Sequence, residues 1–346
     1  MPKMAVIGTT SWGTTLGVVL AHKGHDVHLW ARTEEEAVRA RNNGFHTAPP
    51  SGVDLSSRLT VTSSLREALA EAKAVILAVP SQAMRKNIKL VAEYLDDSML
   101  IVSAAKGLEI GTSLRMSQVI AEEIAPAFRE NICVLSGPNL SPEIMSGLPA
   151  ASVVAAGDEA IARKAQKLLA TPELCIFTHT DVVGIELGGS LKNIVALGAG
   201  IADGLGYGDN AKSALITRGL TEMTALGVAL GANPLTFSGL AGLGDLIATC
   251  SSPLSRNHYV GVELARGRPL NEITGTMTGV AEGVSTTLVV WNLARQMGLE
   301  MPITEAIYRV LYEGADVRKS AVELMSAAAA HELAGRKWRL FSFLRR

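Results

Sequence analysis

The stretch VIGTTSWGTTLG, residues 6–17, decides the fold. A short apolar run leads into it and a helical pattern follows, which predicts a strand, a tight turn and a helix. Gly8 and Gly13 hold the first and third places of a dinucleotide-binding glycine pattern, whereas Thr10 holds the second, where a glycine lets a pyrophosphate approach the backbone. The helix N-terminus still offers free N–H groups, so we expect the contact with the phosphate to be weakened or displaced but not lost. The alternative is that the stretch is an ordinary tight turn without a nucleotide site.

Outside this stretch, the two halves of the chain follow different patterns. The first half alternates helical patterns with short apolar runs, which predicts a largely parallel sheet covered on both faces. The second half shows long helical patterns, at residues 183–205, 214–231 and 282–298. We therefore expect an α/β Rossmann-like N-terminal domain (1–183), an all-α C-terminal domain (184–335) and a basic-aromatic tail (336–346). The predicted strands are residues 3–8, 26–30, 74–79, 99–104, 131–136, 151–156 and 174–179.

Composition excludes several classes of protein. The 346 residues include 32 Lys and Arg against 33 Asp and Glu, so no basic excess indicates nucleic-acid binding. The apolar stretches are interrupted before the roughly 20 residues of a spanning helix, and the N-terminus lacks a secretory signal pattern. Neither the cysteines nor the histidines have the spacing of metal ligands. We therefore interpret the three cysteines, Cys133, Cys175 and Cys250, as thiols of the protein core. The expectation is a cytoplasmic protein without a metal site.

The residue after the second predicted strand bears on the choice of cofactor. An acidic residue there would read the ribose of NAD, but the stretch LWARTEE places Arg32 at this point. A guanidinium suits the 2′-phosphate of NADP, so Arg32 favours NADP over NAD. The alternative is a solvated residue at the start of a helix.

Polar residues follow three predicted strands at the sheet edge where ligands bind in open α/β sheets. These turns are VPSQ (79–82), AAKGLE (104–109) and SGPNLSPE (136–143). Lys106 is suited to neutralising an anion or polarising a carbonyl, and Asn139 and Ser141 follow a Gly137-Pro138 turn. Each feature alone has a structural alternative, a surface lysine or a plain turn. Their coincidence on one edge favours a binding site.

The helical half contributes further candidates. Lys192 lies among apolar and small residues, where an unpaired charge is costly; burial and positive neighbours would lower its pKa and a carboxylate would raise it. A lysine that reaches water is the alternative. The segment 239–257 is rich in glycine and then presents Asp245, Thr249 and Ser255, followed by Arg256 and Asn257. Arg256 with Asn257 suits a phosphate or carboxylate, although a solvated loop arginine fits the same pattern.

Taken together, these motifs show that the chain resembles the bacterial-type NAD(P)-dependent glycerol-3-phosphate dehydrogenases over residues 4–330. The resemblance implies reversible reduction of dihydroxyacetone phosphate to sn-glycerol 3-phosphate for glycerophospholipid synthesis, with NADP or NAD as cofactor, in an enzyme that is often a homodimer. It rests on the stretches SWGT, AAKGLE, SGPNL, ELGGSLKNIVALGAGIADGLGYGDNAKSALITRG, GLAGLGDLIATC, SRN, AEG and MPITEAIYRVLYEG.

The same resemblance implies roles for individual residues. Lys192 would be the catalytic proton donor and acceptor. Substrate-binding residues would be Lys106, Gly137, Asn139, Lys192, Asp245, Ser255, Arg256 and Asn257. Together with the glycine pattern, the cofactor-binding residues would be Gly8, Ser11, Trp12, Gly13, Arg32, Lys106, Ser141, Arg256, Val280 and Glu282.

The chain departs from the family pattern at three places. The family usually has Gly-Ala-Gly-Ser where this chain has Gly8-Thr9-Thr10-Ser11, Gly17 replaces a residue that is commonly alanine, and residues 44–57 also differ. Two alternatives follow: a non-catalytic relative that senses a metabolite, or a related β-hydroxyacid-type dehydrogenase. The tail GRKWRLFSFLRR (335–346) adds the hypothesis of weak contact with an anionic membrane surface.

Overall fold

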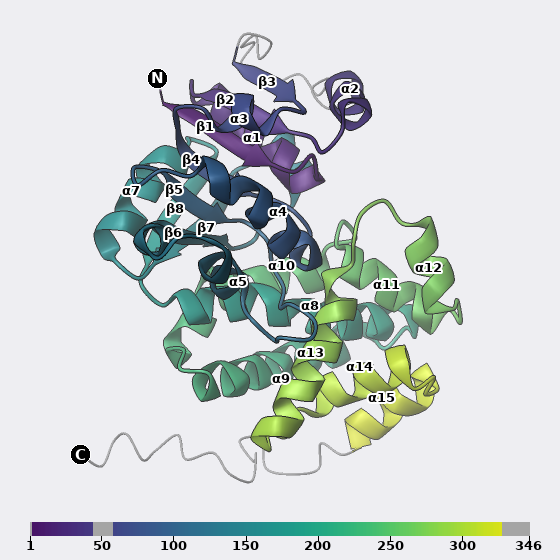
Figure 1. The fold of residues 1–346 in the computed structure, drawn as a ribbon. Coiled ribbons are helices and arrows are strands. Elements are labelled where there is room, and N and C mark those ends of the chain that lie inside the picture. The colour runs from purple at the N-terminus through teal and green to yellow at the C-terminus, as the bar shows by residue number, and fades with distance from the viewer. Residues whose placement is uncertain (1, 44–57, 327–346) are drawn as a thin grey trace, which may run out of the picture.

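The computed structural model describes residues 2–43 and 58–326. Within this part, one eight-stranded sheet forms the first half of the molecule (Figure 1). Its strands are β1 (Lys3–Ile7), β2 (Asp26–Trp30), β3 (Leu59–Thr62), β4 (Ala72–Leu77), β5 (Leu100–Ser103), β6 (Ile132–Ser136), β7 (Ala150–Ala156) and β8 (Leu174–His179). They lie in the order β3-β2-β1-β4-β5-β6-β7-β8.

The strand order is that of a doubly wound sheet. Neighbouring strands from β3 to β6 pair in parallel, while β7 pairs antiparallel to β6 and parallel to β8. The order reverses between β1 and β4, and ligands of such sheets bind at the carboxyl ends of the strands at this switch point. The predicted Rossmann-like, largely parallel sheet is confirmed. The sequence patterns missed β3, which has only four residues, two of them threonine.

Seven helices of the described residues cover the sheet, and strand alternation divides the apolar side chains between two cores. Met4 and Val6 of β1 face one core, packed by α1, α6 and α7, whereas Ala5 and Ile7 face the other, packed by α3, α4 and α5. These helices are α1 (Ser11–His22), α2 (Glu34–Asn43), α3 (Leu65–Leu69), α4 (Met84–Val91), α5 (Met116–Glu123), α6 (Ser141–Met145) and α7 (Glu159–Leu169).

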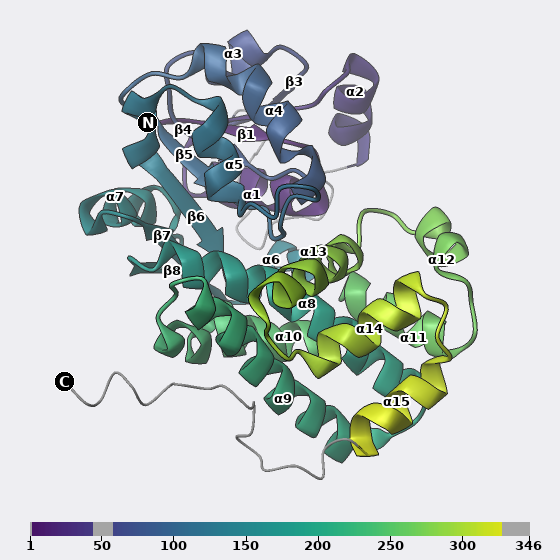
Figure 2. The same ribbon diagram turned by 60° about the horizontal axis from the view of Figure 1, so that its bottom comes forward.

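The second half is helical, as predicted, and α8 runs through its centre (Figure 2). By length and composition α8 is apolar enough to cross a membrane, which corrects the expectation that all apolar stretches are shorter. However, 89% of its most apolar stretch is buried inside the protein, so it serves as a core helix. The helices are α8 (Val182–Gly204), α9 (Gly208–Ala229), α10 (Asp245–Ser251), α11 (Arg256–Ala265), α12 (Leu270–Thr276), α13 (Glu282–Met297), α14 (Pro302–Tyr312) and α15 (Val317–Ser326).

Two glycines let α8 and α11 cross with their backbones in contact. A Cβ atom on Gly200 would lie 2.0 Å from the carbonyl oxygen of His258, and one on Gly261 would lie 2.1 Å from that of Leu197. These separations are too short for any side chain. The small face of α8 therefore accepts another helix at close range, and this crossing brings Asn257 to Asn193 in the middle of α8.

The cysteines are not all core residues. Cys133 and Cys250 are buried, as predicted, but Cys175 is exposed. Cys175 lies in β8 at the edge of the sheet, where buried and exposed residues alternate, and its position falls on the exposed side. An apolar run alone does not distinguish an edge strand from a central strand, which is why the sequence-based interpretation of Cys175 was wrong.

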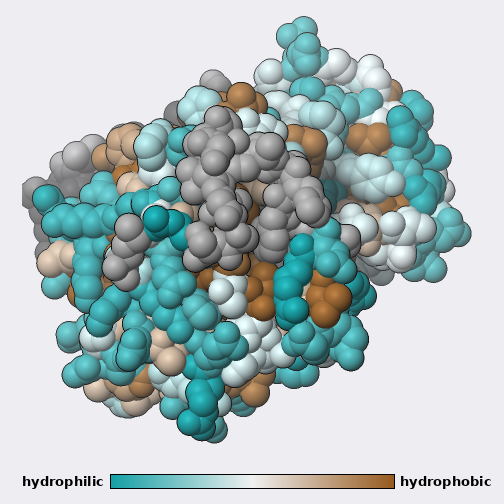
Figure 3. All heavy atoms as spheres, turned by 90° about the horizontal axis from the view of Figure 1, so that it is seen from above, coloured by the Kyte–Doolittle hydropathy of each residue, from teal (hydrophilic) through white to brown (hydrophobic). Residues whose placement is uncertain are grey.

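Hydrophilic side chains predominate on the face of the molecule that Figure 3 shows. Hydrophobic side chains appear between them in several groups. The large exposed apolar residues come from separate elements, for example Leu148, Leu235 and Val322. Exposed apolar residues scattered in this way are ordinary on a folded protein.

Replacing Gly200 with alanine tests the helix crossing. We expect Gly200→Ala to lower the free energy of unfolding by about 3 kcal/mol, because the new methyl group forces α8 away from the backbone of α11. Gly198→Ala is the matched control on the same helix, since its Cβ would meet the flexible side-chain ends of Leu215, at 3.1 Å, and Ile307, at 3.7 Å, and not a backbone atom of another helix. Urea denaturation followed by circular dichroism measures both. Equal stability of the two variants would contradict this description of the crossing.

Candidate active site

The glycine loop joins β1 to α1 at the switch point of the sheet. Gly8 has a φ of +108°, and a Cβ there would lie 2.9 Å from the carbonyl oxygen of Ala78, which follows β4. A Cβ on Gly13 would lie 2.1 Å from the carbonyl oxygen of Gly8. Both positions therefore exclude side chains, as expected for the first and third glycines of a dinucleotide-binding turn.

Thr10 is accommodated because its hydroxyl belongs to the fold. Its Oγ1 accepts a hydrogen bond from the N–H of Gly13 at 3.0 Å, which caps α1, and donates to the carbonyl oxygen of Ala78 at 2.7 Å. Helix geometry leaves the N–H groups of Ser11 and Trp12 without acceptors inside the helix. The buried indole Nε1 of Trp12 also has no protein partner among the described residues. The loop thus keeps donors for a phosphate-bearing cofactor despite the threonine.

At the centre of the molecule, one carboxylate joins two lysines. Lys192 of α8 donates to Oδ1 of Asp245 at 2.5 Å and to the hydroxyl of Thr249 at 2.5 Å. Lys106, in the turn after β5, donates to Oδ2 of Asp245 at 2.7 Å and to the carbonyl oxygen of Gly137 at 2.7 Å. The side chains of Lys192 and Asp245 are 7% and 1% exposed, whereas that of Lys106 is 17% exposed. Lys106 therefore lies on the solvent side of the cluster.

Burial lowers the pKa of Lys192 to about 8, from an ordinary value of 10.5. The Asp245 carboxylate opposes this shift, and the positive charge of Lys106 adds to it. These opposing influences agree with those expected for Lys192 from its sequence neighbours. A lysine with such a pKa changes its protonation near physiological pH, which suits it to donate and accept a proton.

Close backbone packing brings Asp245 to Lys192. The glycine-rich residues Leu240–Gly244 form a π-helical turn that leads directly into α10. This turn lies directly against the backbone of α8. A Cβ on Gly188 of α8 would be only 2.5 Å from the carbonyl oxygen of Ala241, so only a glycine fits there. The contact of Thr249 with Lys192 was missed from the sequence, although a residue four positions after Asp245 shares its helix face.

The turn after β6 supplies unpaired polar groups beside the lysines. Gly137 has a φ of +136° and packs against the backbone of Ser152. Asn139 accepts from the Ser152 hydroxyl at 2.5 Å, which leaves its buried Nδ2 without a protein partner among the described residues. The buried hydroxyl of Ser136 also lacks one. Unpaired buried donors are costly, so this turn is suited to a polar ligand. Ser141 follows as the first residue of α6, and it is partly buried.

The segment around Arg256 combines structural and available groups. Ser255 caps α11 by accepting from the N–H of His258 at 3.2 Å. The Asn257 side chain donates to Asn193 of α8 at 2.8 Å and accepts from the N–H of Gly283 at 2.9 Å. Asn257 therefore holds α8 and α13 together.

Arg256 lies beside the loop that leads into α13. A Cβ on Gly279 would be 2.6 Å from its Nη1, so the absence of a side chain there makes room for the guanidinium. Val280, the next residue, is 45% exposed.

Carboxylates of the helical half also bind the turns of the sheet half. Glu282 accepts from the N–H of Ser81 at 2.9 Å and from its hydroxyl at 2.5 Å. Burial raises the pKa of Glu282, while Ser81 and the nearby Arg256 oppose the shift. Glu186 of α8 likewise accepts from the N–H and hydroxyl of Ser117, at 2.7 and 2.6 Å. Glu282 is a predicted cofactor residue, but neither of these contacts was predicted, because residue spacing offers no signal for them.

Comparison with known proteins agrees with this geometry. Residues 3–162 match the N-terminal model, and residues 181–322 the C-terminal model, of NAD-dependent glycerol-3-phosphate dehydrogenase. The chain belongs to this family. A relative from Dehalococcoides mccartyi, named glycerol-3-phosphate dehydrogenase [NAD(P)+], is 63% identical over 100% of this chain and 97% of its own length. A relative of the same name from Citrifermentans bemidjiense is 46% identical over 94% and 97% of the two chains.

Solved structures show the same fold. The crystal structure of glycerol-3-phosphate dehydrogenase from Coxiella burnetii is 33% identical, with a TM-score of 0.86 over 94% of this chain and 98% of that one. The predicted family, an NAD(P)-dependent oxidoreductase with a small-molecule substrate, is therefore confirmed. The individual residue roles stay predictions.

The remaining predicted cofactor residue, Arg32, lies at the carboxyl end of β2. Its side chain is 68% exposed, and its Nε is 4.0 Å from the carboxylate of Glu36. The guanidinium is free to reach a ligand, because so exposed an ion pair is weak. Glu36 was not anticipated from the sequence.

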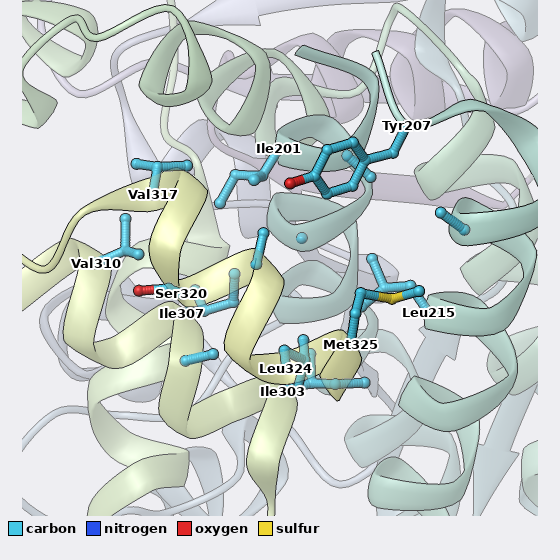
Figure 4. Close-up of a pocket in the computed structure, with 15 residues that line it drawn as sticks. Ile201, Tyr207, Leu215, Ile303, Ile307, Val310, Val317, Ser320, Leu324 and Met325 are labelled. Atoms are coloured by element: carbon cyan, nitrogen blue, oxygen red, sulfur yellow. The ribbon is translucent and has the colours of Figure 1, made fainter. Parts of the chain in front are cut away.

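A separate pocket lies among α8, α9, α14 and α15 (Figure 4). Its lining contains no lysine, arginine or histidine, so it provides no cation for a phosphorylated substrate. The cluster of Lys106, Lys192 and Asp245 differs from this pocket in that it contains two cationic side chains. The pocket residues are Gly198, Ile201, Ala202, Tyr207, Ala211, Leu215, Ile303, Ala306, Ile307, Val310, Val317, Ser320, Ala321, Leu324 and Met325.

No group of three or more histidine, cysteine, aspartate or glutamate side chains suited to a metal ion occurs in residues 2–43 and 58–326. The segment 44–57 and the tail 336–346, both singled out in the sequence, lie outside the described residues.

Removing the shared carboxylate tests the electrostatics of the cluster. We expect Asp245→Asn to lower the free energy of unfolding at pH 7 by about 3 kcal/mol, because it leaves the buried Lys192 charge without its partner. The double variant Lys192→Met/Asp245→Asn should be more stable than Asp245→Asn by about 1 kcal/mol, since the stranded charge is gone and Lys106 still reaches water. Urea denaturation of both variants and of Lys192→Met measures this coupling. A double variant less stable than Asp245→Asn would contradict it.

Proposed function

We propose that Lys192 transfers the proton when this enzyme interconverts dihydroxyacetone phosphate and sn-glycerol 3-phosphate. The observation that supports it is a buried lysine whose ammonium group is held by Asp245 and Thr249, with a pKa lowered to about 8. The reduced nicotinamide, when bound, supplies the hydride. Protonated Lys192 then donates a proton to the alkoxide oxygen that forms at the former carbonyl, and in the reverse reaction neutral Lys192 removes the proton from the hydroxyl.

Other residues of the cluster bind and orient the substrate in this proposal. Lys106 faces the solvent side, where its ammonium group attracts the anionic substrate. The unpaired Nδ2 of Asn139 donates to a substrate oxygen. Arg256 binds the phosphate, because a guanidinium offers two parallel donors to phosphate oxygens. The substrate site also includes Gly137, Asp245, Ser255 and Asn257; of these, Ser255 and Asn257 act mainly through helix packing.

The cofactor site follows the glycine loop in this proposal. Free N–H groups of Ser11 and Trp12 bind the pyrophosphate at the N-terminus of α1. Arg32 lies at the adenosine end, where its charge favours the 2′-phosphate of NADP. The site is completed by Gly8, Gly13, Lys106, Ser141, Arg256, Val280 and Glu282.

The composition of the chain and its resemblance to the family support further proposals about the whole protein. Residues 1–183 form the dinucleotide-binding domain and residues 184–335 the catalytic domain, with the tail 336–346 at most in weak contact with membrane surfaces. The protein is a cytoplasmic homodimer that does not bind nucleic acid. Its product, sn-glycerol 3-phosphate, supplies glycerophospholipid synthesis.

Replacing Lys192 tests the catalytic assignment. We expect Lys192→Met to lower kcat for the reduction of dihydroxyacetone phosphate about 1000-fold, because the alkoxide loses its proton donor. Oxidation of NADPH and NADH, followed by absorbance, measures the rate, and calorimetry checks that cofactor binding is retained. Lys86→Met, which removes an exposed lysine of α4, should be fully active.

Three outcomes would overturn the proposal. Near-normal turnover by Lys192→Met would exclude Lys192 as the proton donor. Binding of substrate and cofactor by the unaltered protein without turnover would favour the metabolite sensor that Thr10 suggested. Turnover of β-hydroxyacids in preference to dihydroxyacetone phosphate would favour the second alternative from the sequence.

The pH dependence of the two directions tests the pKa of Lys192. Reduction needs the protonated lysine, so its kcat/KM should be constant at low pH and fall above about pH 8. Oxidation needs the neutral lysine and should rise with pH up to about the same value. Asp245→Asn removes the influence that raises the pKa, so we expect both profiles to shift to lower pH. Profiles that keep the same midpoint in Asp245→Asn would contradict this assignment.

A further inference from the structure

Two loops meet where the adenosine end of a dinucleotide lies in this fold. Strands β1 and β2 are parallel neighbours, and the N–H of Gly8 donates to the carbonyl oxygen of Trp30 at 3.1 Å. Thr9 lies two residues after the end of β1, and Arg32 lies two residues after the end of β2. In doubly wound nucleotide-binding sheets, the residues after the second strand read the ribose of the adenosine.

Glu36, in the first turn of α2, bridges these two loops. The hydroxyl of Thr9 donates to one of its carboxylate oxygens, and the N–H of Arg32 donates to the other at 3.3 Å. The same carboxylate lies 4.0 Å from Nε of Arg32. Its side chain is 28% exposed, so the carboxylate is fixed by its neighbours and remains accessible from solvent. The sequence places Thr9 where the family usually has alanine, so the tether depends on a residue that departs from the usual family pattern.

We propose that Glu36 determines how strongly this enzyme discriminates between NADH and NADPH. The inference rests on the use of NAD or NADP in the proposed function. A carboxylate at this position accepts a hydrogen bond from the ribose 2′-hydroxyl of NADH. It repels the 2′-phosphate of NADPH and competes with that phosphate for Arg32. Glu36 therefore offsets the preference for NADPH that Arg32 alone would confer.

Removing the charge of Glu36 tests this role by binding rather than by turnover. Isothermal titration calorimetry of the full-length protein gives the Kd of NADPH and of NADH. In Glu36→Gln, which keeps an oxygen to accept from Thr9, we expect NADPH to bind about tenfold more tightly and NADH no more tightly than before. Thr9→Ala keeps the charge but releases the tether, so we expect a smaller change in the same direction. Glu35→Gln is the matched control, because it removes the same charge from an exposed neighbour in α2.

The outcomes separate this inference from the proposed function. A ratio of the two Kd values that is the same in Glu36→Gln and Glu35→Gln would refute the role of Glu36 and leave the dehydrogenase assignment intact. A larger change in Glu35→Gln than in Glu36→Gln would refute it as well, because the effect would then arise from general charge. Failure of the unaltered protein to bind either cofactor would refute the cofactor site itself and, with it, this inference.

Discussion

The active site depends on the buried carboxylate of Asp245. A lysine as deeply buried as Lys192 is costly when charged and unpaired, and Asp245 at 2.5 Å makes the charge tolerable. The other oxygen of the same carboxylate holds Lys106 at 2.7 Å. One aspartate therefore fixes the positions of both ammonium groups. It also limits how far burial lowers the pKa of Lys192, so that this lysine can still carry a proton near neutral pH.

The same physical solution recurs where the two halves of the molecule meet. Glu282 and Glu186, both from the helical half, accept hydrogen bonds from the N–H and hydroxyl groups of Ser81 and Ser117 in the sheet half. Each carboxylate satisfies backbone donors that would otherwise be unpaired in the interface. The contacts fix the turn after β4 against α13 and the first turn of α5 against α8.

The glycine loop shows how a departure from a motif can be absorbed. Thr10 replaces the glycine that normally lets a phosphate approach, yet its hydroxyl caps α1 and binds the carbonyl oxygen of Ala78. The Thr10 hydroxyl therefore makes its hydrogen bonds to other groups of the protein. The neighbouring Thr9 extends the change to the second loop through Glu36. Two adjacent threonines thus connect the glycine loop to the end of β4 and to α2.

The sequence alone determined the doubly wound sheet, the helical second half and the pairing of Gly8 with Gly13, because these depend on local periodicity and on steric limits of the backbone. It also identified Lys106, Lys192 and Asp245 as candidates, since charged residues stand out among apolar and glycine-rich neighbours. Only the tertiary structure decided that one carboxylate joins both lysines, which lie 53 and 139 residues from Asp245 along the chain. Contacts at such separations arise from how helices pack, and residue spacing carries no record of them. For the same reason the bridge from Glu36 to Thr9, across two strands, became visible only in the fold.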